Sequence, residues 1–122
     1  MSSDPSTPPL DAAALARLRE LDPDGRHGVV TKVLNAFDGS LRRMLGQLTA
    51  ELDGGDVSVV SSVAHTLKSS AASVGALSLS RACHEVEQRV RSGTPGDLRA
   101  EIERLLAEGQ AALTAVGAML RP

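Results

Sequence analysis

The residue with the clearest chemical potential in this sequence is His65. In the helix predicted around it, apolar residues recur every three or four positions, and His65 points roughly 140° away from the direction that they define. We therefore expect the imidazole to face solvent or to lie at the edge of a groove. Neutral histidine is a nucleophile at cellular pH, so an exposed imidazole could accept a phosphoryl group and release it again.

The neighbours predicted to share the face of His65 are mostly small. An exposed helix face is normally filled with long charged side chains, which form helices better than serine does. Small residues would instead let the backbone of another protein approach the imidazole. Lys68 is the exception, one turn along, where its ammonium could meet a phosphoryl group carrying nearly two negative charges. The residues that we expect to contact a partner are Ser61, Ser62, Ser69 and Ala72.

A carboxylate on the following helix is predicted to lie beside His65. If the chain reverses around Ala76, an antiparallel partner at the height of His65 lies near residue 87, because both positions are eleven residues from 76. We therefore predict that Glu87 accepts a hydrogen bond from Nδ1–H of His65, which leaves Nε2 free as the nucleophile. The alternative is that Glu87 is a structural carboxylate at the surface.

The apolar periodicity predicts the helices that position these groups. A short helix is expected over about 11–21, and four longer ones have apolar positions spanning 29–52, 60–74, 79–90 and 98–116. The long second helix could bend near Gly39-Ser40, and residues 22–25 read as a turn. Short connections imply antiparallel neighbours. The predicted fold class is all-α, an antiparallel up-down four-helix bundle over 10–122 with a short extra N-terminal helix, after a flexible tail over 1–9.

Helix boundaries are predicted from capping signals. Gly54-Gly55 is expected to end the long second helix, and Gly75 to terminate the helix of His65. For the last helix we expect Pro95 at its first position and Asp97 in a pair resembling a capping box. The expected N-caps are Asp11, Asp56 and Thr94.

Composition restricts the functional classes. Phe37 is the only aromatic residue and the formal net charge is -2, whereas a nucleic-acid binder would be expected to show a basic face or stacking aromatics. No apolar run approaches the ~20 residues that span a bilayer. Cys83 is the single cysteine, is expected to be buried, and is not expected to form a metal site with His84. We expect a cytoplasmic helical domain.

The segment 65–76, HTLKSSAASVGA, resembles the motif of histidine phosphotransfer (HPt) domains, with its histidine, leucine, lysine, small residue, serine, aliphatic residue and Gly-Ala corner. Ser69 stands where many members carry glycine. The similarity extends to Cys83, Glu87 and the helix with Phe37, over about residues 11–118.

The resemblance implies a four-helix bundle that accepts phosphate on His65 from a receiver-domain aspartate, or a hybrid kinase, and passes it to another receiver domain. The sequence leaves the oligomeric state open, and a monomer is our default expectation. It implies Lys68 as the electrostatic helper and Ser69 as the position of close approach. It also implies no cofactor of its own, since Mg²⁺ belongs to the receiver, and no autonomous kinase activity.

Two other functions remain open. A histidine kinase fragment is disfavoured by the absence of a Gly-rich nucleotide loop and of an Arg/Lys-Thr-Pro pattern after the histidine. A non-catalytic helical binding module would dock a receiver-like partner without phosphotransfer. Neither membrane nor nucleic acid is expected as a partner.

Overall fold

The computed structural model describes residues 10–93 and 97–120. All regular structure within these ranges is helical, which confirms the predicted all-α class. The helices are α1 (Ala12–Glu20), α2 (Val29–Ala50), α3 (Val57–Ser73), α4 (Leu77–Arg91) and α5 (Leu98–Leu120). The predicted flexible tail over 1–9 and the predicted cap Thr94 with Pro95 lie outside the described residues. Among the helices that are described, none is long and apolar enough to span a membrane.

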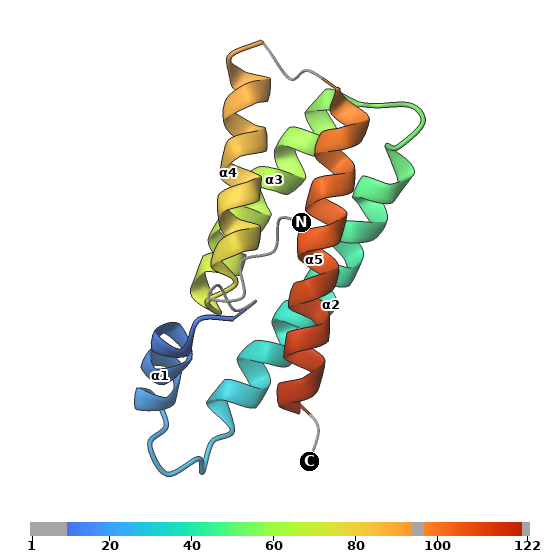
Figure 1. The fold of residues 1–122 in the computed structure, drawn as a ribbon. Coiled ribbons are helices and arrows are strands. Elements are labelled where there is room, and N and C mark those ends of the chain that lie inside the picture. The colour runs from blue at the N-terminus through green and yellow to red at the C-terminus, as the bar shows by residue number, and fades with distance from the viewer. Residues whose placement is uncertain (1–9, 94–96, 121–122) are drawn as a thin grey trace, which may run out of the picture.

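The four longer helices pack around one apolar interior (Figure 1). α2 contacts α3 and α5, and α4 contacts the same two helices. Successive long helices run in opposite directions, and α1 lies at the end where α3 turns into α4 (Figure 1). The α3–α4 pair, which carries His65 and Glu87, is the most extensively packed.

The interior is aliphatic, as the composition predicts, and it includes Phe37 and Cys83. On α2 the buried face differs from the predicted stripe, because Val29 and Val33 are only half-buried; Leu52, the last residue of the predicted stripe, lies beyond the end of the helix and is also half-buried. α2 packs against α1, α3 and α5, so its buried arc is not one stripe and takes in further residues such as Leu34 and Met44. The large side chains with less than 2% exposure are Leu34, Leu41, Leu48, Leu67, Leu79, Ile102, Leu105, Val60, Val74, Val86, Val116 and Cys83.

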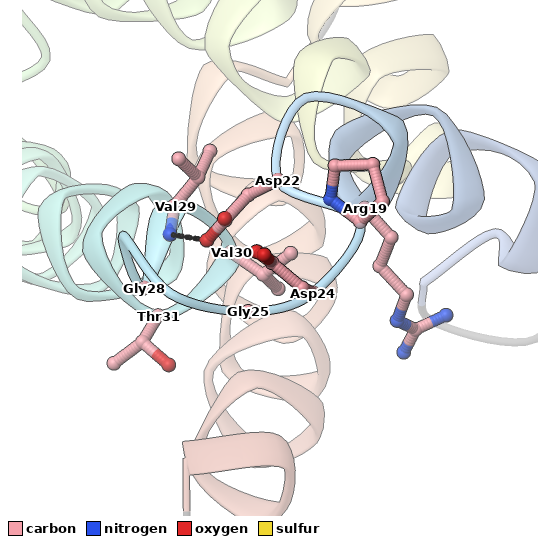
Figure 2. A pocket seen from close by; sticks show the side chains of 9 residues that line it. Arg19, Asp22, Asp24, Gly25, Gly28, Val29, Val30 and Thr31 are labelled. Atoms are coloured by element: carbon pink, nitrogen blue, oxygen red, sulfur yellow. Dashed lines mark hydrogen bonds between the residues drawn. The ribbon is translucent and has the colours of Figure 1, made fainter.

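The start of α2 depends on a buried carboxylate that sequence reasoning assigned only to a turn. Asp22 is 6% exposed and accepts hydrogen bonds from the backbone N–H groups of His27 (3.0 Å) and Val29 (3.2 Å). Figure 2 shows Asp22 turned toward Val29 across the hollow between the turn and the helix. The predicted turn itself is confirmed by the bond from Gly25 N to Asp22 O (3.0 Å). The side chain thus supplies the cap that Gly28 lacks.

The other predicted helix boundaries are confirmed in some cases and wrong in others. Asp11 and Asp56 are N-caps, accepting from the N–H groups of Ala14 and Ser58. α2 runs through Gly39 as one helix and ends at Ala50, before the predicted Gly54-Gly55 stop. α5 begins at Leu98, later than the predicted first position at Pro95. Asp97 caps it, because its Oδ1 accepts from the N–H groups two and three residues ahead, those of Arg99 and Ala100.

The corner between α3 and α4 is a Schellman motif, as the Gly75 terminator predicts. Ala76 N donates to Ala71 O (2.8 Å), and Gly75 N donates to Ala72 O (3.1 Å). Gly75 has a φ of +81°, and its carbonyl accepts from Asp11 N (2.7 Å). A Cβ at this position would lie 2.8 Å from Asp11 N and 2.9 Å from the Cβ of Ala14. Glycine is therefore required both by the turn and by the approach of α1.

Replacing Gly75 by alanine is expected to destabilise the fold by about 3 kcal/mol, since backbone strain and a steric clash combine. Gly25→Ala is the matched control, because Gly25 has a φ of +73° but open space around a Cβ. Strain alone should cost about 1 kcal/mol there. Urea unfolding of both variants measures the difference. Equal losses would show that the contact with α1 contributes nothing.

Candidate functional site

His65 lies in the middle of α3 on the face opposite the core. Its neighbours Ala64 and Leu67 are completely buried, whereas the His65 side chain is 67% exposed. The orientation predicted from apolar periodicity is confirmed. A 67% exposed ring can be touched by the surface of another protein without any rearrangement of the helices.

Glu87 of α4 lies beside His65, at the height predicted by counting from the corner. The distance between His65 Nδ1 and Glu87 Oε2 is 2.6 Å, so the predicted contact is confirmed. Glu87 is only 3% exposed, and the alternative of a surface carboxylate is therefore wrong. An ionised carboxylate only accepts hydrogen bonds. Nδ1 therefore carries a proton, and in the neutral ring Nε2 keeps its lone pair.

Two cations complete the surroundings of Glu87. Lys68 Nζ donates to Glu87 Oε1 at 2.6 Å, and its side chain is 29% exposed. Arg91 Nη2 lies 3.4 Å from Glu87 Oε2, with a side chain that is 67% exposed. Sequence reasoning assigned Lys68 to a phosphoryl group, not to Glu87, and it missed Arg91. The signal for Arg91 was its spacing of four residues from Glu87 along one helix.

The two contacts with α3 determine the charge of Glu87. The hydrogen bond from Lys68 is the largest influence, and the hydrogen bond from His65 is the second. Together they lower the pKa of Glu87 to about 2, against the opposing effect of burial. The carboxylate is therefore ionised throughout the physiological range, and the site consists of one fixed negative charge, the two cations Lys68 and Arg91, and the imidazole of His65.

The register of α3 against α4 is maintained by groups on both sides of the site. Ser80 Oγ donates to the backbone carbonyl of Lys68 at 2.8 Å, which ties the first turns of α4 to the helix that carries His65. At the other end of the contact, Val86 is completely buried next to Glu87. Apolar packing and this hydrogen bond together place the carboxylate opposite the imidazole.

The predicted docking residues lie around His65 as an open surface. Ser62, Ser69 and Ala72 are exposed, and Ser61 is half-buried. Ser70 bonds locally, to the carbonyl of Leu67 (3.3 Å). The small side chains leave the imidazole as the feature that projects from this face of α3.

Two hollows lie between α2 and α3, and of the predicted docking residues Ser62 lines one of them. One is lined by Arg43 of α2 together with Ser62 and Thr66 of α3. The other lies between Phe37 of α2 and Ser70 of α3. They share Ser40 of α2, so they lie along one seam between α2 and α3.

The remaining candidate residues stand apart from this site. Cys83 is completely buried, as predicted, and burial raises the pKa of its thiol to about 12. His84 is exposed on the neighbouring position of α4, and His27 is exposed in the loop before α2. Within 10–93 and 97–120, no group of three His, Cys, Asp or Glu residues is arranged to bind a metal ion.

Known proteins resemble this chain over most of its length. The model of the Hpt domain family matches residues 32–117. The phosphorelay protein LuxU of Vibrio cholerae is 32% identical over 74 residues, which span 61% of this chain and 66% of that protein.

Two solved structures share the fold. Histidine-containing phosphotransfer protein B of Pseudomonas aeruginosa superposes with a TM-score of 0.79 at 27% identity, covering 93% of this chain and 95% of that one. The HPT domain of a hybrid sensor histidine kinase from Shewanella superposes with a TM-score of 0.76 at 23% identity, covering 91% and 92%. At that lower identity, the second similarity concerns the fold alone.

The all-helical fold and the match of the Hpt domain model to residues 32–117 place the chain in the class of histidine phosphotransfer domains, and an exposed histidine beside a buried carboxylate is consistent with it. The chain belongs to the Hpt domain family. Histidine phosphotransfer in a two-component phosphorelay is the function of this domain, whose members are phosphoryl carriers and not classical enzymes.

The pKa of Glu87 has a consequence for acid stability. Because its value is depressed in the folded chain, Glu87 contributes stability above its ordinary value of 4.5 and loses that contribution as the pH falls toward about 2. Urea unfolding between pH 7 and pH 2 should therefore show a steeper loss in the wild type than in Glu87→Gln. Glu85→Gln, on the same helix but paired with Arg104, is the control and should follow the wild type. Parallel curves for the wild type and Glu87→Gln would contradict the assignment.

Proposed function

We propose that His65 is the phosphoacceptor of this chain, which receives a phosphoryl group from the aspartate of a receiver domain and passes it to another receiver domain. The observation that carries this proposal is the exposed imidazole whose Nδ1 lies 2.6 Å from a buried carboxylate. That contact directs the lone pair of Nε2 outward, toward any partner that covers α3. The surrounding serines allow such a partner to approach closely.

In the proposed reaction, the lone pair of Nε2 attacks the phosphorus atom of an aspartyl phosphate. The Nε2–P bond forms as the bond between phosphorus and the aspartate oxygen breaks, and the electron pair of that bond remains on the partner's carboxylate. Positioning and charge neutralisation supply most of the rate enhancement in such transfers. Transfer onward is the same step in reverse, with a different receiver.

The charges around His65 suit the group that is transferred. Lys68 and Arg91 contribute two positive charges and Glu87 one negative charge, so the site has an excess of one positive charge before transfer. A transferred phosphoryl unit adds one net negative charge, and the site then becomes neutral. The flexible side chains of Lys68 and Arg91 can each turn from Glu87 toward the phosphoryl oxygens.

The finer architecture and the partners follow from the same proposal. We infer an antiparallel up-down four-helix bundle formed by α2–α5, with α1 appended, which is supported by the helix neighbours and their alternating directions. The receiver supplies Mg²⁺, and this chain needs no cofactor and has no kinase activity of its own. We infer a cytoplasmic monomer whose partners are response-regulator receivers and a hybrid kinase, docking over the face of Ser61, Ser62, Ser69 and Ala72 in a transient interface.

Incubation with a phosphorylated receiver domain tests the acceptor. Acid-labile label is expected on the wild-type chain and at background level on His65→Gln, because no other imidazole is paired with a buried carboxylate in the described ranges. His84→Gln and His27→Gln are matched controls, since both remove an exposed imidazole and should label normally. Persistent label on His65→Gln would exclude His65. Normal binding of the receiver without any label would instead support a non-catalytic binding module.

Lys68→Ala is expected to slow transfer by about tenfold or more while changing receiver affinity by less than about threefold, because the ammonium acts on the moving charge. Single-turnover transfer and a binding titration measure the two effects separately. Arg81→Ala, which removes an exposed cation from α4, serves as the control. A loss of affinity with an unchanged transfer rate would mean that Lys68 docks the partner.

A further inference from the structure

The transfer step changes the charge of the imidazole ring. The form of His65 that can attack phosphorus is the neutral ring, with its proton on Nδ1 facing Glu87 and a lone pair on Nε2. Once Nε2 is bonded to phosphorus, both nitrogens carry a substituent and the ring becomes a cation. This cation can then lose its Nδ1 proton to solvent at a pH that depends on the charges around it.

The leaving-group chemistry of the onward step depends on that proton. If Nδ1 is still protonated, cleavage of the Nε2–P bond returns an electron pair to Nε2 and releases neutral imidazole. If the proton has been lost, the same cleavage must release an imidazolate anion, which is a far poorer leaving group. A carrier that waits for its second partner therefore benefits from a group that keeps the proton in place.

We propose that Glu87, beyond orienting the ring, keeps the proton on Nδ1 of His65 while the phosphoryl group is attached to Nε2, so that neither transfer step exchanges a proton with solvent. This inference rests on His65 being the phosphoacceptor. Glu87 acts through the ring and is a positioning residue. Glu87 Oε2 lies 2.6 Å from His65 Nδ1, and Glu87 as a whole is only 3% exposed. The attraction between its carboxylate and the cationic ring is therefore weakly screened by solvent and salt.

The balance of the complete cycle follows from this arrangement. In the first step, Nε2 gains a bond to phosphorus and the ring keeps its Nδ1 proton against Glu87. In the second step, a carboxylate oxygen of the next receiver forms a bond to phosphorus, the Nε2–P bond breaks, and its electron pair returns to Nε2. His65 is then in its starting form, and the carboxylate of Glu87 is unchanged.

The other charges near the ring have defined positions. Lys68 of α3 and Arg91 of α4 oppose a ring cation; in the unphosphorylated chain both are paired with Glu87, and after transfer the charge of the phosphoryl oxygens offsets theirs. From α2, Arg43 lines the hollow that also contacts Ser62 and Thr66 of α3, on the flank of His65 that faces α2. The charges between α4 and α5 are paired with one another, as Glu85–Arg104 and Arg89–Glu101. Glu87 is consequently the acidic group in contact with the ring.

The experiment measures the phosphorylated ring directly. The full chain is phosphorylated with potassium phosphoramidate, and the signals of phosphorylated His65 are followed by ³¹P and ¹⁵N NMR against pH. The titration midpoint of the ring is expected to fall by about one pH unit or more in Glu87→Gln, because an adjacent opposite charge is removed while the shape is kept. Glu85→Gln, which removes the same charge elsewhere on α4, should leave the midpoint unchanged.

Onward transfer to an unphosphorylated receiver supplies the second readout. The transfer rate of Glu87→Gln, divided by that of the wild type, should fall by about tenfold as the pH rises from about 6 to about 8. The reason is that, at a pH above both midpoints, a midpoint lower by about one pH unit leaves about a tenth as much protonated ring. If Glu87 had a purely structural role, the substitution would lower the transfer rate by the same factor at both of these pH values. An unchanged midpoint together with a pH-independent rate ratio would overturn the proposal.

A further variant keeps the proposal testable if Glu87→Gln does not fold. Lys68→Met removes a cation from the same cluster, so the midpoint of phosphorylated His65 should rise; a fall would contradict the charge balance described here. A wild-type chain that yields no phosphorylated His65 signal, with label only on His84 or His27, would overturn the phosphoacceptor assignment itself. That result differs from a normal His65 signal with an unmoved midpoint, which would overturn only the role of Glu87.

Discussion

A buried carboxylate cannot remain ionised in a helical interior unless its oxygens are bonded to donors. Glu87 meets this condition with Lys68 on Oε1 and with His65 and Arg91 on Oε2. Most of the site follows from that requirement. The imidazole must turn Nδ1 toward α4, and the two cations must lie beside it. The reactive nitrogen is therefore oriented by the same contacts that make burial of the charge possible.

The fold supplies this arrangement through one tight connection. Gly75 allows α3 to end in a left-handed turn, and the chain reverses within a few residues, so positions equally distant from the corner come together. α1 packs directly on this glycine, through the bond between Asp11 N and Gly75 O. The short N-terminal helix thus supports the corner that sets the register of His65 against Glu87.

Much of this could be predicted from the sequence, because the signals are local. Periodicity placed His65 on an exposed face, and counting from the Gly75 corner placed Glu87 opposite to it. The start of α5 and the half-burial of Val29 and Val33 could not be read in this way. A helix start depends on which of several possible caps the tertiary packing selects, here Asp97. The width of a buried arc depends on how many helices touch it.

The sequence by itself determined an all-helical chain with a nucleophilic imidazole on a face of small residues, since both features follow from residue type and spacing along one helix. Only the tertiary structure decided how the charges are shared. Arg91 reaches Glu87 along α4 itself, at a spacing of four residues, whereas Lys68 reaches Glu87 from α3 because α3 and α4 pack in one register. The contact between Lys68 and Glu87 depends on distances of a few ångströms between helices, and no pattern along the chain contains those distances.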